Sequence, residues 1–93
     1  MRLTLLSRAY CHLCDEMRDA LAPIAAAHGA SVEMIDVDAA GNEALEATWG
    51  SFVPVLFAGP PDATPELCHY RLDADRVVTA LTTAPVARDT EIR

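Results

Sequence analysis

The sequence predicts one α/β domain with the element order β-α-β-α-β-β-α, in which a four-stranded mixed sheet carries helices on both faces. Three observations lead to this prediction. Strand-like apolar runs alternate with helical runs in the first half of the chain, so the strands there must be joined by crossover connections. The last two strand-like runs are separated by a turn rich in proline, which is compatible with a hairpin. The length of 93 residues suits one small domain.

The first half of the chain contains two predicted strands and two predicted helices. The strand at 2–7 has leucines on both faces, as expected inside a sheet. The helix from 12 to about 28 has an apolar stripe at three- and four-residue spacing, and the strand at 31–37 mixes apolar and acidic residues. The helix at 43–49 has only a weak apolar face, and Gly50 ends it.

The second half begins with a short apolar strand at 55–57. Pro54 stands at the entrance of this strand, a position where proline is tolerated. The partner strand of the hairpin is predicted at 66–71. Trp49 and Phe52, which precede the hairpin, are expected in the core rather than on a binding surface.

A last helix completes the domain. Asp73 is a suitable N-cap, and the apolar face that follows it ends near Thr82. We therefore expect the domain to cover residues 1–82. The segment 83–93 has no clear apolar period and is expected to be a flexible C-terminal tail.

The composition argues against several classes of function. The net charge is −7, and the seven basic residues are all arginines scattered along the chain. We expect no binding to nucleic acid, which needs clustered Lys and Arg. No apolar stretch approaches the ~20 residues that span a membrane, and the short apolar run at the N-terminus is followed by Arg8, unlike a secretory signal. These features predict a cytoplasmic protein with no membrane partner.

Two cysteines lie at the junction between the first predicted strand and the first predicted helix. In a reducing compartment, a pair such as Cys11 and Cys14 is more often redox-active or metal-binding than part of a structural disulfide framework. Unpaired N–H groups and the dipole at a helix start stabilise a thiolate, so the pKa of Cys11 should lie below its usual value of about 8.5. Cys11 can then attack a disulfide, and Cys14, one turn further along, can resolve the mixed disulfide.

Other candidate residues have more than one interpretation. Arg8 attracts a substrate carboxylate or stabilises the thiolate, or it is an ordinary surface charge. Tyr10 lines the substrate surface, or it packs within its loop. His12 tunes the thiolate near neutral pH, or it is a solvated residue at the helix start. Cys68 is expected to pack against a helix, with a redox role as the alternative.

The chain resembles the thioredoxin fold in its glutaredoxin variety, and more narrowly the small glutaredoxin-like proteins of bacteria and plants. Within residues 2–82, the resemblance is carried by Leu5-Leu6-Ser7-Arg8-Ala9-Tyr10-Cys11-His12-Leu13-Cys14-Asp15, by Val32 to Asp38, and by Trp49-Gly50-Ser51-Phe52-Val53-Pro54-Val55-Leu56. It implies that Cys11 is the nucleophile and Cys14 the resolving thiol. It also implies that Pro54 is a cis-proline beside the dithiol. Val53 would offer its backbone to an extended thiol substrate, as glutathione is held in glutaredoxins.

The sequence departs from ordinary glutaredoxins in three places, one of which is Arg8, near the position where those proteins commonly have Lys. His12-Leu13 stands between the cysteines, where those proteins carry Pro-Tyr. Their Gly-Gly-Asp corner near the last helix, which helps to hold glutathione, is replaced here by the run that ends at Asp73. Asp73 could supply the carboxylate of that corner, but the closely approaching glycine backbone is missing.

The sequence therefore predicts a monomeric thiol–disulfide oxidoreductase. Its substrate would be a disulfide-containing protein or a glutathione mixed disulfide, and a thiol reductant would reset it. No resident cofactor or metal is expected; glutathione would enter only as reductant or substrate. Two alternatives stay open: a thioredoxin-fold module that binds a protein or a thiol metabolite without turnover, and a metal or iron–sulfur carrier. The candidate ligands of such a carrier would be Cys11, His12, Cys14, Cys68 and His69.

Overall fold

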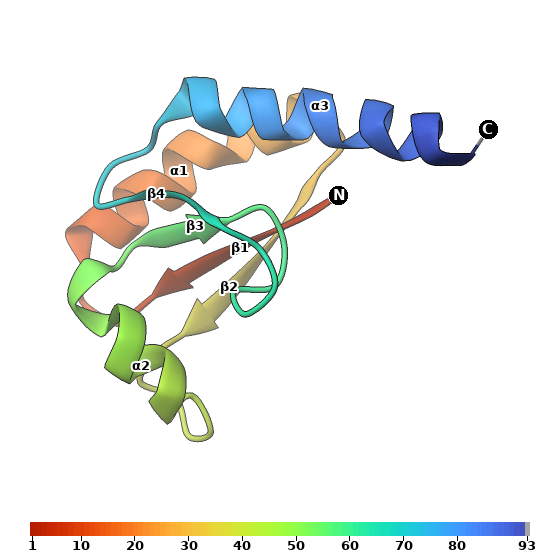
Figure 1. The fold of residues 1–93 in the computed structure, drawn as a ribbon. Coiled ribbons are helices and arrows are strands. Elements are labelled where there is room, and N and C mark those ends of the chain that lie inside the picture. Colours follow the sequence, from red (N-terminus) through yellow and green to blue (C-terminus); the bar gives the residue numbers. More distant parts are fainter. Residues whose placement is uncertain (93) are drawn as a thin grey trace.

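The computed structural model describes the backbone of residues 1–92 and the side chains of residues 1–83. Its elements in chain order are β1 (Arg2–Ser7), α1 (His12–Ala27), β2 (Ser31–Asp36), α2 (Glu43–Trp49), the short 3-10 helix η1 (Gly50–Phe52), β3 (Val55–Phe57), β4 (Glu66–His69) and α3 (Ala74–Ile92), as Figure 1 shows. The predicted order of strands and helices is confirmed.

The last helix is longer than predicted. Sequence analysis ended it near Thr82, whereas α3 continues to Ile92. That prediction was wrong because the loss of an apolar period reports the loss of packing, not of helical backbone. A helix already nucleated on the core adds a hydrogen bond with each further residue. The flexibility of 83–93 stays a prediction, and Arg93 lies outside the described residues.

The four strands form one mixed sheet in the order β2-β1-β3-β4. β1 runs parallel to β2 and antiparallel to β3, and β3 and β4 form the expected antiparallel hairpin. β1 is interior to the sheet, and its Leu3, Leu5 and Leu6 are fully buried. The apolar side chains on both faces of this strand are therefore buried, because other elements pack against both sides of the sheet.

Helices cover both faces of the sheet, as predicted. Figure 1 shows α1 and α3 side by side on one face and α2 on the other. The core between the sheet, α1 and α3 contains Leu3, Leu5, Met17, Leu21, Leu56, Leu67, Cys68, Val77 and Leu81. The core on the α2 side contains Leu6, Cys14, Val37, Val53, Val55 and Phe57, and Leu45 and Trp49 of α2 pack against it.

The register of the strands brings several loops to one end of the sheet. Leu6 of β1 pairs with Val55 of β3, and Val55 also pairs with His69 of β4. On the other side, Ser7 pairs with Asp36 at the end of β2. The loops that follow β1, β2 and β4 therefore meet the loop that precedes β3. Within the described part of the chain, no helix has both the length and the apolar character needed to cross a membrane.

Candidate active site

Cys11 and Cys14 form a disulfide at the start of α1. Cys11 is the N-cap of the helix and has extended backbone angles, with φ −113° and ψ 105°. Its Sγ accepts a hydrogen bond from the backbone N–H of Cys14 at 3.1 Å, and their Cα atoms are 5.2 Å apart. A donor that a helix start leaves without a backbone partner is thus directed at the sulfur of Cys11.

The two sulfur-bearing residues differ in exposure. Cys14 is 1% exposed and belongs to the core on the α2 side, whereas Cys11 is only partly buried against that core. Val53 lies in the same cluster, so the dithiol and the loop before β3 pack against the same part of the core. A more accessible first sulfur and a sheltered second sulfur match the order that a dithiol exchange requires.

Tyr10, the residue before Cys11, projects into solvent. Its ring is fully exposed, and its backbone is left-handed with φ +59°. The left-handed region costs about 1–2 kcal/mol for a residue with a Cβ. The alternative that Tyr10 packs within its loop is therefore wrong for the ring, which makes no buried contact. Its part in substrate binding stays a prediction.

The loop that enters β3 carries Val53 and Pro54. Both are buried, and the peptide bond between them is cis. The Pro54 carbonyl accepts a hydrogen bond from the Tyr70 N–H at 2.9 Å, which fixes the end of β4 against this loop. The sequence placed these two residues next to the dithiol by resemblance, and the strand register brings their loop to the same end of the sheet.

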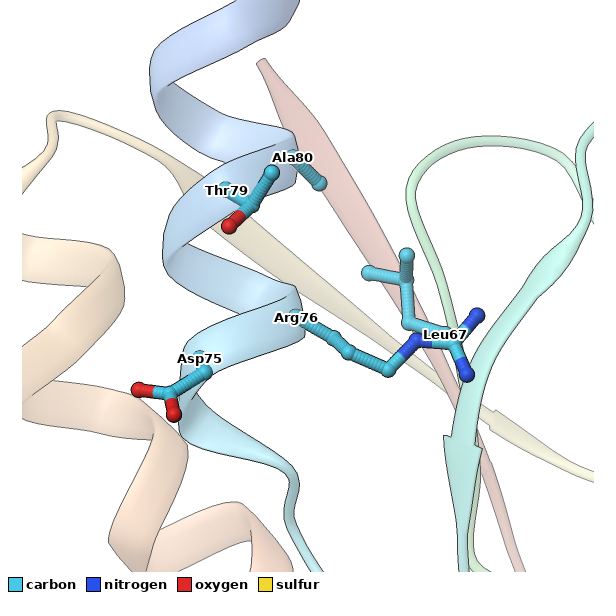
Figure 2. A pocket seen from close by; sticks show the side chains of 5 residues that line it. All are labelled: Leu67, Asp75, Arg76, Thr79 and Ala80. Carbon is cyan, nitrogen blue, oxygen red and sulfur yellow. The ribbon is translucent and has the colours of Figure 1, made fainter.

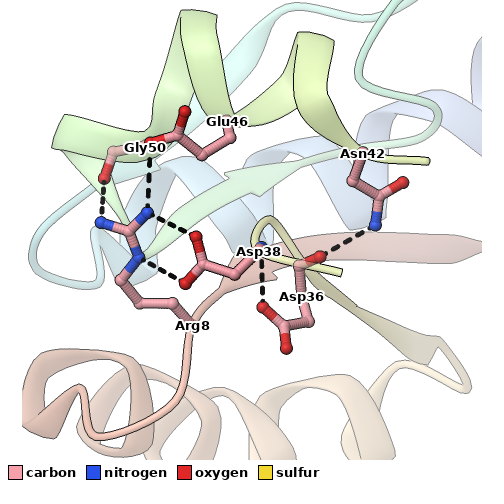
Figure 3. Close-up of polar contacts among 6 residues, drawn as sticks. All are labelled: Arg8, Asp36, Asp38, Asn42, Glu46 and Gly50. Carbon is pink, nitrogen blue, oxygen red and sulfur yellow. Dashed lines mark hydrogen bonds and ion pairs between the residues drawn. The ribbon is translucent and has the colours of Figure 1, made fainter. Parts of the chain in front are cut away.

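Arg8 is held by groups from two other segments, as Figure 3 shows. Its Nε and Nη2 donate to the two carboxylate oxygens of Asp38 at 3.1 and 2.9 Å. Nη2 also donates to Glu46 at 3.3 Å, and Nη1 to the carbonyl of Gly50 at 3.3 Å. The hydrogen bond to Asp38 is the main reason why the pKa of Arg8 lies above its usual range, with Glu46 adding to it.

This set of contacts, which we call the Arg8 clamp, ties the loop before the dithiol to α2 and η1. The Asp38 loop is itself braced, because Asp38 N–H donates to the Asp36 side chain at 2.9 Å and the Asn42 side chain donates to the Asp36 carbonyl at 2.8 Å. Arg8 is thus a partly exposed charge that is paired within the fold, and its role beside the dithiol stays a prediction. Its predicted role in substrate binding would have to compete with these internal partners.

His12 and Asp73 lie at the starts of two helices. His12 is the first residue of α1 and is exposed. Asp73 caps α3 as predicted, since its Oδ1 accepts from the Arg76 N–H at 3.2 Å and its carbonyl from the Val77 N–H at 3.1 Å. The carboxylate that the resemblance implied for a substrate is therefore engaged by its own helix. Substrate roles for His12 and Asp73 stay predictions.

Cys68 is the remaining thiol. It is buried beneath α1 and α3, as the core interpretation predicted, and neighbouring His69 points outward. Burial raises the pKa of this thiol, and a hydrogen bond involving the Asp73 backbone partly offsets the rise. Cys68 is therefore a neutral core residue near pH 7.

Sequence analysis missed an exposed group of three rings, which we call the aromatic triad: Phe52, His69 and Tyr70. The ring centroids are 5.6 Å apart for Phe52–His69, 4.8 Å for His69–Tyr70 and 6.3 Å for Phe52–Tyr70. The prediction that Phe52 is a core residue was wrong, because its side chain is 41% exposed. Trp49 is half-buried and packs against the core on the α2 side, in agreement with the prediction for it. Its ring meets that of Phe57 edge-on, with 5.2 Å between the ring centroids. No local pattern in the sequence indicates that Phe52 lies beside His69 and Tyr70, because these residues are distant in sequence and meet only in the folded chain.

A hollow lies elsewhere, between β4 and α3, as Figure 2 shows. It has a volume of about 350 Å³ and is lined by Leu67, Asp75, Arg76, Thr79 and Ala80. None of these is a predicted site residue, and the lining contains neither a thiol nor an imidazole. The dithiol is therefore the better candidate for an active site. Among the residues that the structure describes, no group of three or more His, Cys, Asp or Glu side chains is placed to hold a metal ion.

Comparison with known proteins agrees with this architecture. The family described as "Glutaredoxin-like domain (DUF836)" matches residues 2–82. The solution NMR structure of protein Ne2328 from Nitrosomonas europaea is 38% identical, with a TM-score of 0.68, over 82% of this chain and 85% of that chain. Thioredoxin 1 from Thermosipho africanus TCF52B is 21% identical, with a TM-score of 0.56, over 99% of this chain and 97% of that chain, and it shows the fold alone. No protein of curated function matches the chain.

The family match covers most of the chain, the fold is thioredoxin-like, and the paired cysteines occupy the start of the first helix. Together they support a redox role for the C-x-x-C pair. The chain belongs to the glutaredoxin-like domain (DUF836) family.

Proposed function

We propose that the protein is a thiol–disulfide oxidoreductase in which Cys11 is the nucleophile and Cys14 the resolving thiol. The single observation that carries this proposal is the Cys14 N–H directed at the Cys11 sulfur at 3.1 Å, at the N-terminus of a 16-residue helix. The same donor and the helix dipole would stabilise a thiolate on Cys11 once the disulfide is reduced.

The reaction is an exchange of two electrons and two protons. The Cys11 thiolate attacks one sulfur of the substrate disulfide, a Cys11–substrate disulfide forms, and the first substrate thiolate leaves and takes up a proton. Cys14 loses its proton and attacks the Cys11 sulfur. The Cys11–Cys14 disulfide then forms, and the second substrate thiolate leaves. Two equivalents of an external thiol reverse these steps and restore the dithiol.

The negative charge of Asp15 beside the pair is partly offset by an arginine. Asp15 follows Cys14 directly, and its negative charge would disfavour a thiolate nearby. However, Arg18 pairs with Asp15 at 3.3 Å and with Asp19 at 3.2 Å. These pairs are exposed and individually weak, but they reduce the opposing field at the helix start.

We propose a protein disulfide or a glutathione mixed disulfide as the substrate, and glutathione or a thioredoxin-type reductase as the source of electrons. The protein would act as a monomer in the cytoplasm. Val53 and Pro54 would flank the substrate chain on the side opposite α1. At the corner where glutaredoxins have Gly-Gly, Tyr70 and Arg71 carry bulky side chains, which favours a protein substrate over free glutathione.

The test is the reduction potential of the Cys11–Cys14 pair, measured by equilibration in defined glutathione buffers followed by trapping of free thiols. We expect a value near those of glutaredoxins, about −200 to −230 mV. The Cys14→Ser variant is the matched control, since it retains Cys11 but cannot close the pair. A wild-type pair that does not close in these buffers would refute the proposal and favour the binding-module or metal-carrier alternative.

A further inference from the structure

We infer that the aromatic triad and Tyr10 form a docking surface for an extended polypeptide that carries arginine or lysine beside its disulfide cysteine. The inference deepens the proposed function by naming the class of substrate. It concerns binding, so it can be measured without turnover. The surface comprises Tyr10, Phe52, His69 and Tyr70.

Large apolar side chains are concentrated at this end of the molecule. Among the described residues, five large hydrophobic side chains are exposed: Met1, Tyr10, Met34, Phe52 and Tyr70. Three of these five belong to the proposed surface. Single exposed apolar residues are ordinary, but adjoining aromatic rings around a reactive site are typical of binding surfaces.

Hydrogen bonds fix the triad beside the loop that enters β3. The Tyr70 N–H donates to the Pro54 carbonyl at 2.9 Å, and the Tyr70 hydroxyl donates to the Ser51 carbonyl at 2.9 Å. His69 pairs with Val55 in the sheet. A polypeptide lying along this loop with its cysteine at Cys11 would therefore pass the three rings.

Backbone strain marks both sides of the surface. Tyr10 and Tyr70, with φ of +59° and +65°, are the non-glycine residues with left-handed backbone in the part of the chain that the structure describes. Such conformations persist where the surrounding structure holds them and are concentrated at functional sites. Here the hydrogen bond from the Tyr70 hydroxyl to the Ser51 carbonyl holds the Tyr70 ring in place before a partner arrives, and this lowers the ordering cost of binding.

The charge of the surface favours a cationic partner. The Glu66 carboxylate contacts a ring nitrogen of His69, so a carboxylate adjoins the rings of the triad. The faces of aromatic rings attract guanidinium and ammonium groups. Arg71 follows Tyr70 and lines a small hollow together with Glu16 of α1. The whole chain carries a net charge of −7 and no lysine, which would steer basic polypeptides toward it and anionic disulfides away.

The experiment compares two peptides of equal length, each with an S-methylated cysteine, flanked in one by arginine and in the other by glutamate. Binding to the oxidised protein is measured by calorimetric or NMR titration. We expect tighter binding of the arginine peptide, with a preference that weakens as salt is added. Phe52→Ala and Tyr10→Ala should each weaken arginine-peptide binding by about two- to fivefold. Glu66→Gln should narrow the difference between the peptides.

Met34→Ala is the matched control, because Met34 is 42% exposed but lies on β2, at the opposite edge of the sheet from β4. It should bind both peptides as the wild type does. Equal binding of the two peptides, tighter binding of the glutamate peptide, or equal losses in Met34→Ala and Phe52→Ala would overturn the docking surface. So would sedimentation showing that a second copy of the chain occupies it.

A second measurement separates this inference from the proposed function. Hydroxyethyl disulfide is small and uncharged, and its reduction by wild type and Met34→Ala depends on the dithiol. Turnover of this compound without discrimination between the peptides would refute the docking surface alone. Discrimination without turnover would support the docking surface and refute the oxidoreductase.

Discussion

Arg8 and Asp38 form a two-point ion pair across 30 positions of sequence, with Nε–Oδ2 at 3.1 Å and Nη2–Oδ1 at 2.9 Å. The pair joins the loop that leads into the dithiol to the loop that leads into α2. Arg8 also reaches the Gly50 carbonyl at the start of η1, the short helix that leads into Val53 and Pro54.

Loss of the Arg8 clamp should therefore slow disulfide exchange. We expect Arg8→Met to lower kcat/KM for a disulfide substrate roughly tenfold or more, since small displacements between reacting groups are costly. Arg8→Lys should restore only part of the rate, because an ammonium cannot bind a carboxylate at two points. The measurement is the steady-state rate for each variant, together with the thermal midpoint.

A double-mutant cycle with Asp38→Asn separates the pair from a general loss of structure. If the two residues act through each other, the effects of Arg8→Met and Asp38→Asn on kcat/KM are less than additive. Additive effects, or full activity in Arg8→Met, would show that the clamp does not position the site. Arg2→Met is a suitable control, because the Arg2–Glu33 pair at 3.5 Å is exposed and lies at the opposite end of β1.

The position of Cys11 at the N-cap of α1 predicts a low pKa. In the reduced protein, the rate of Cys11 alkylation followed against pH should give a midpoint below about 8.5. The pKa of Cys11 is lowered, not raised, because the helix start stabilises the thiolate and not the neutral thiol. Cys14→Ser allows the measurement without the second thiol, and Cys11→Ser should abolish turnover. A midpoint at or above 8.5 would contradict the role assigned to the helix terminus.

Burial of Cys68 predicts a loss of stability at alkaline pH. Its folded pKa is raised above the ordinary value of a thiol, mainly by burial, so the neutral thiol is favoured in the folded protein. The resulting stabilisation is fully present below the unfolded pKa of about 8.5 and is lost as the pH rises through the folded pKa, because the unfolded chain ionises first. Denaturant unfolding of wild type and Cys68→Ala at pH 7 and pH 10 tests this. The wild type should lose more stability between the two values, and equal losses would contradict the prediction.

The cap formed by Asp73 predicts different effects for two substitutions. Asp73→Ala should lower the free energy of unfolding by about 1 kcal/mol, whereas Asp73→Asn, which can still cap, should leave it nearly unchanged. Asp73→Asn also removes the negative charge that the resemblance assigns to glutathione binding. If KM for glutathione disulfide rises in Asp73→Asn while stability stays the same, the carboxylate has a substrate role besides its cap.

Local patterns in the sequence determined much of this protein. The bounds of β1, α2 and β3 follow from apolar period and from breakers such as Gly50 and Pro54, which act over a few residues. The C-x-x-C pair at a helix start and the Asp73 cap are also local, because capping joins residues three positions apart.

Tertiary structure decided the rest. Arg8 finds its partners 30, 38 and 42 positions away, and only the strand register brings those groups to one end of the sheet. The hydrophobicity of Phe52 predicts a core residue, yet its side chain is 41% exposed and lies beside His69 and Tyr70, residues distant in sequence. The part of α3 beyond Thr82 was likewise not predicted by the apolar pattern. The physical reason is common to these cases: period and caps encode the backbone of an element, while contacts between distant side chains depend on how the elements pack.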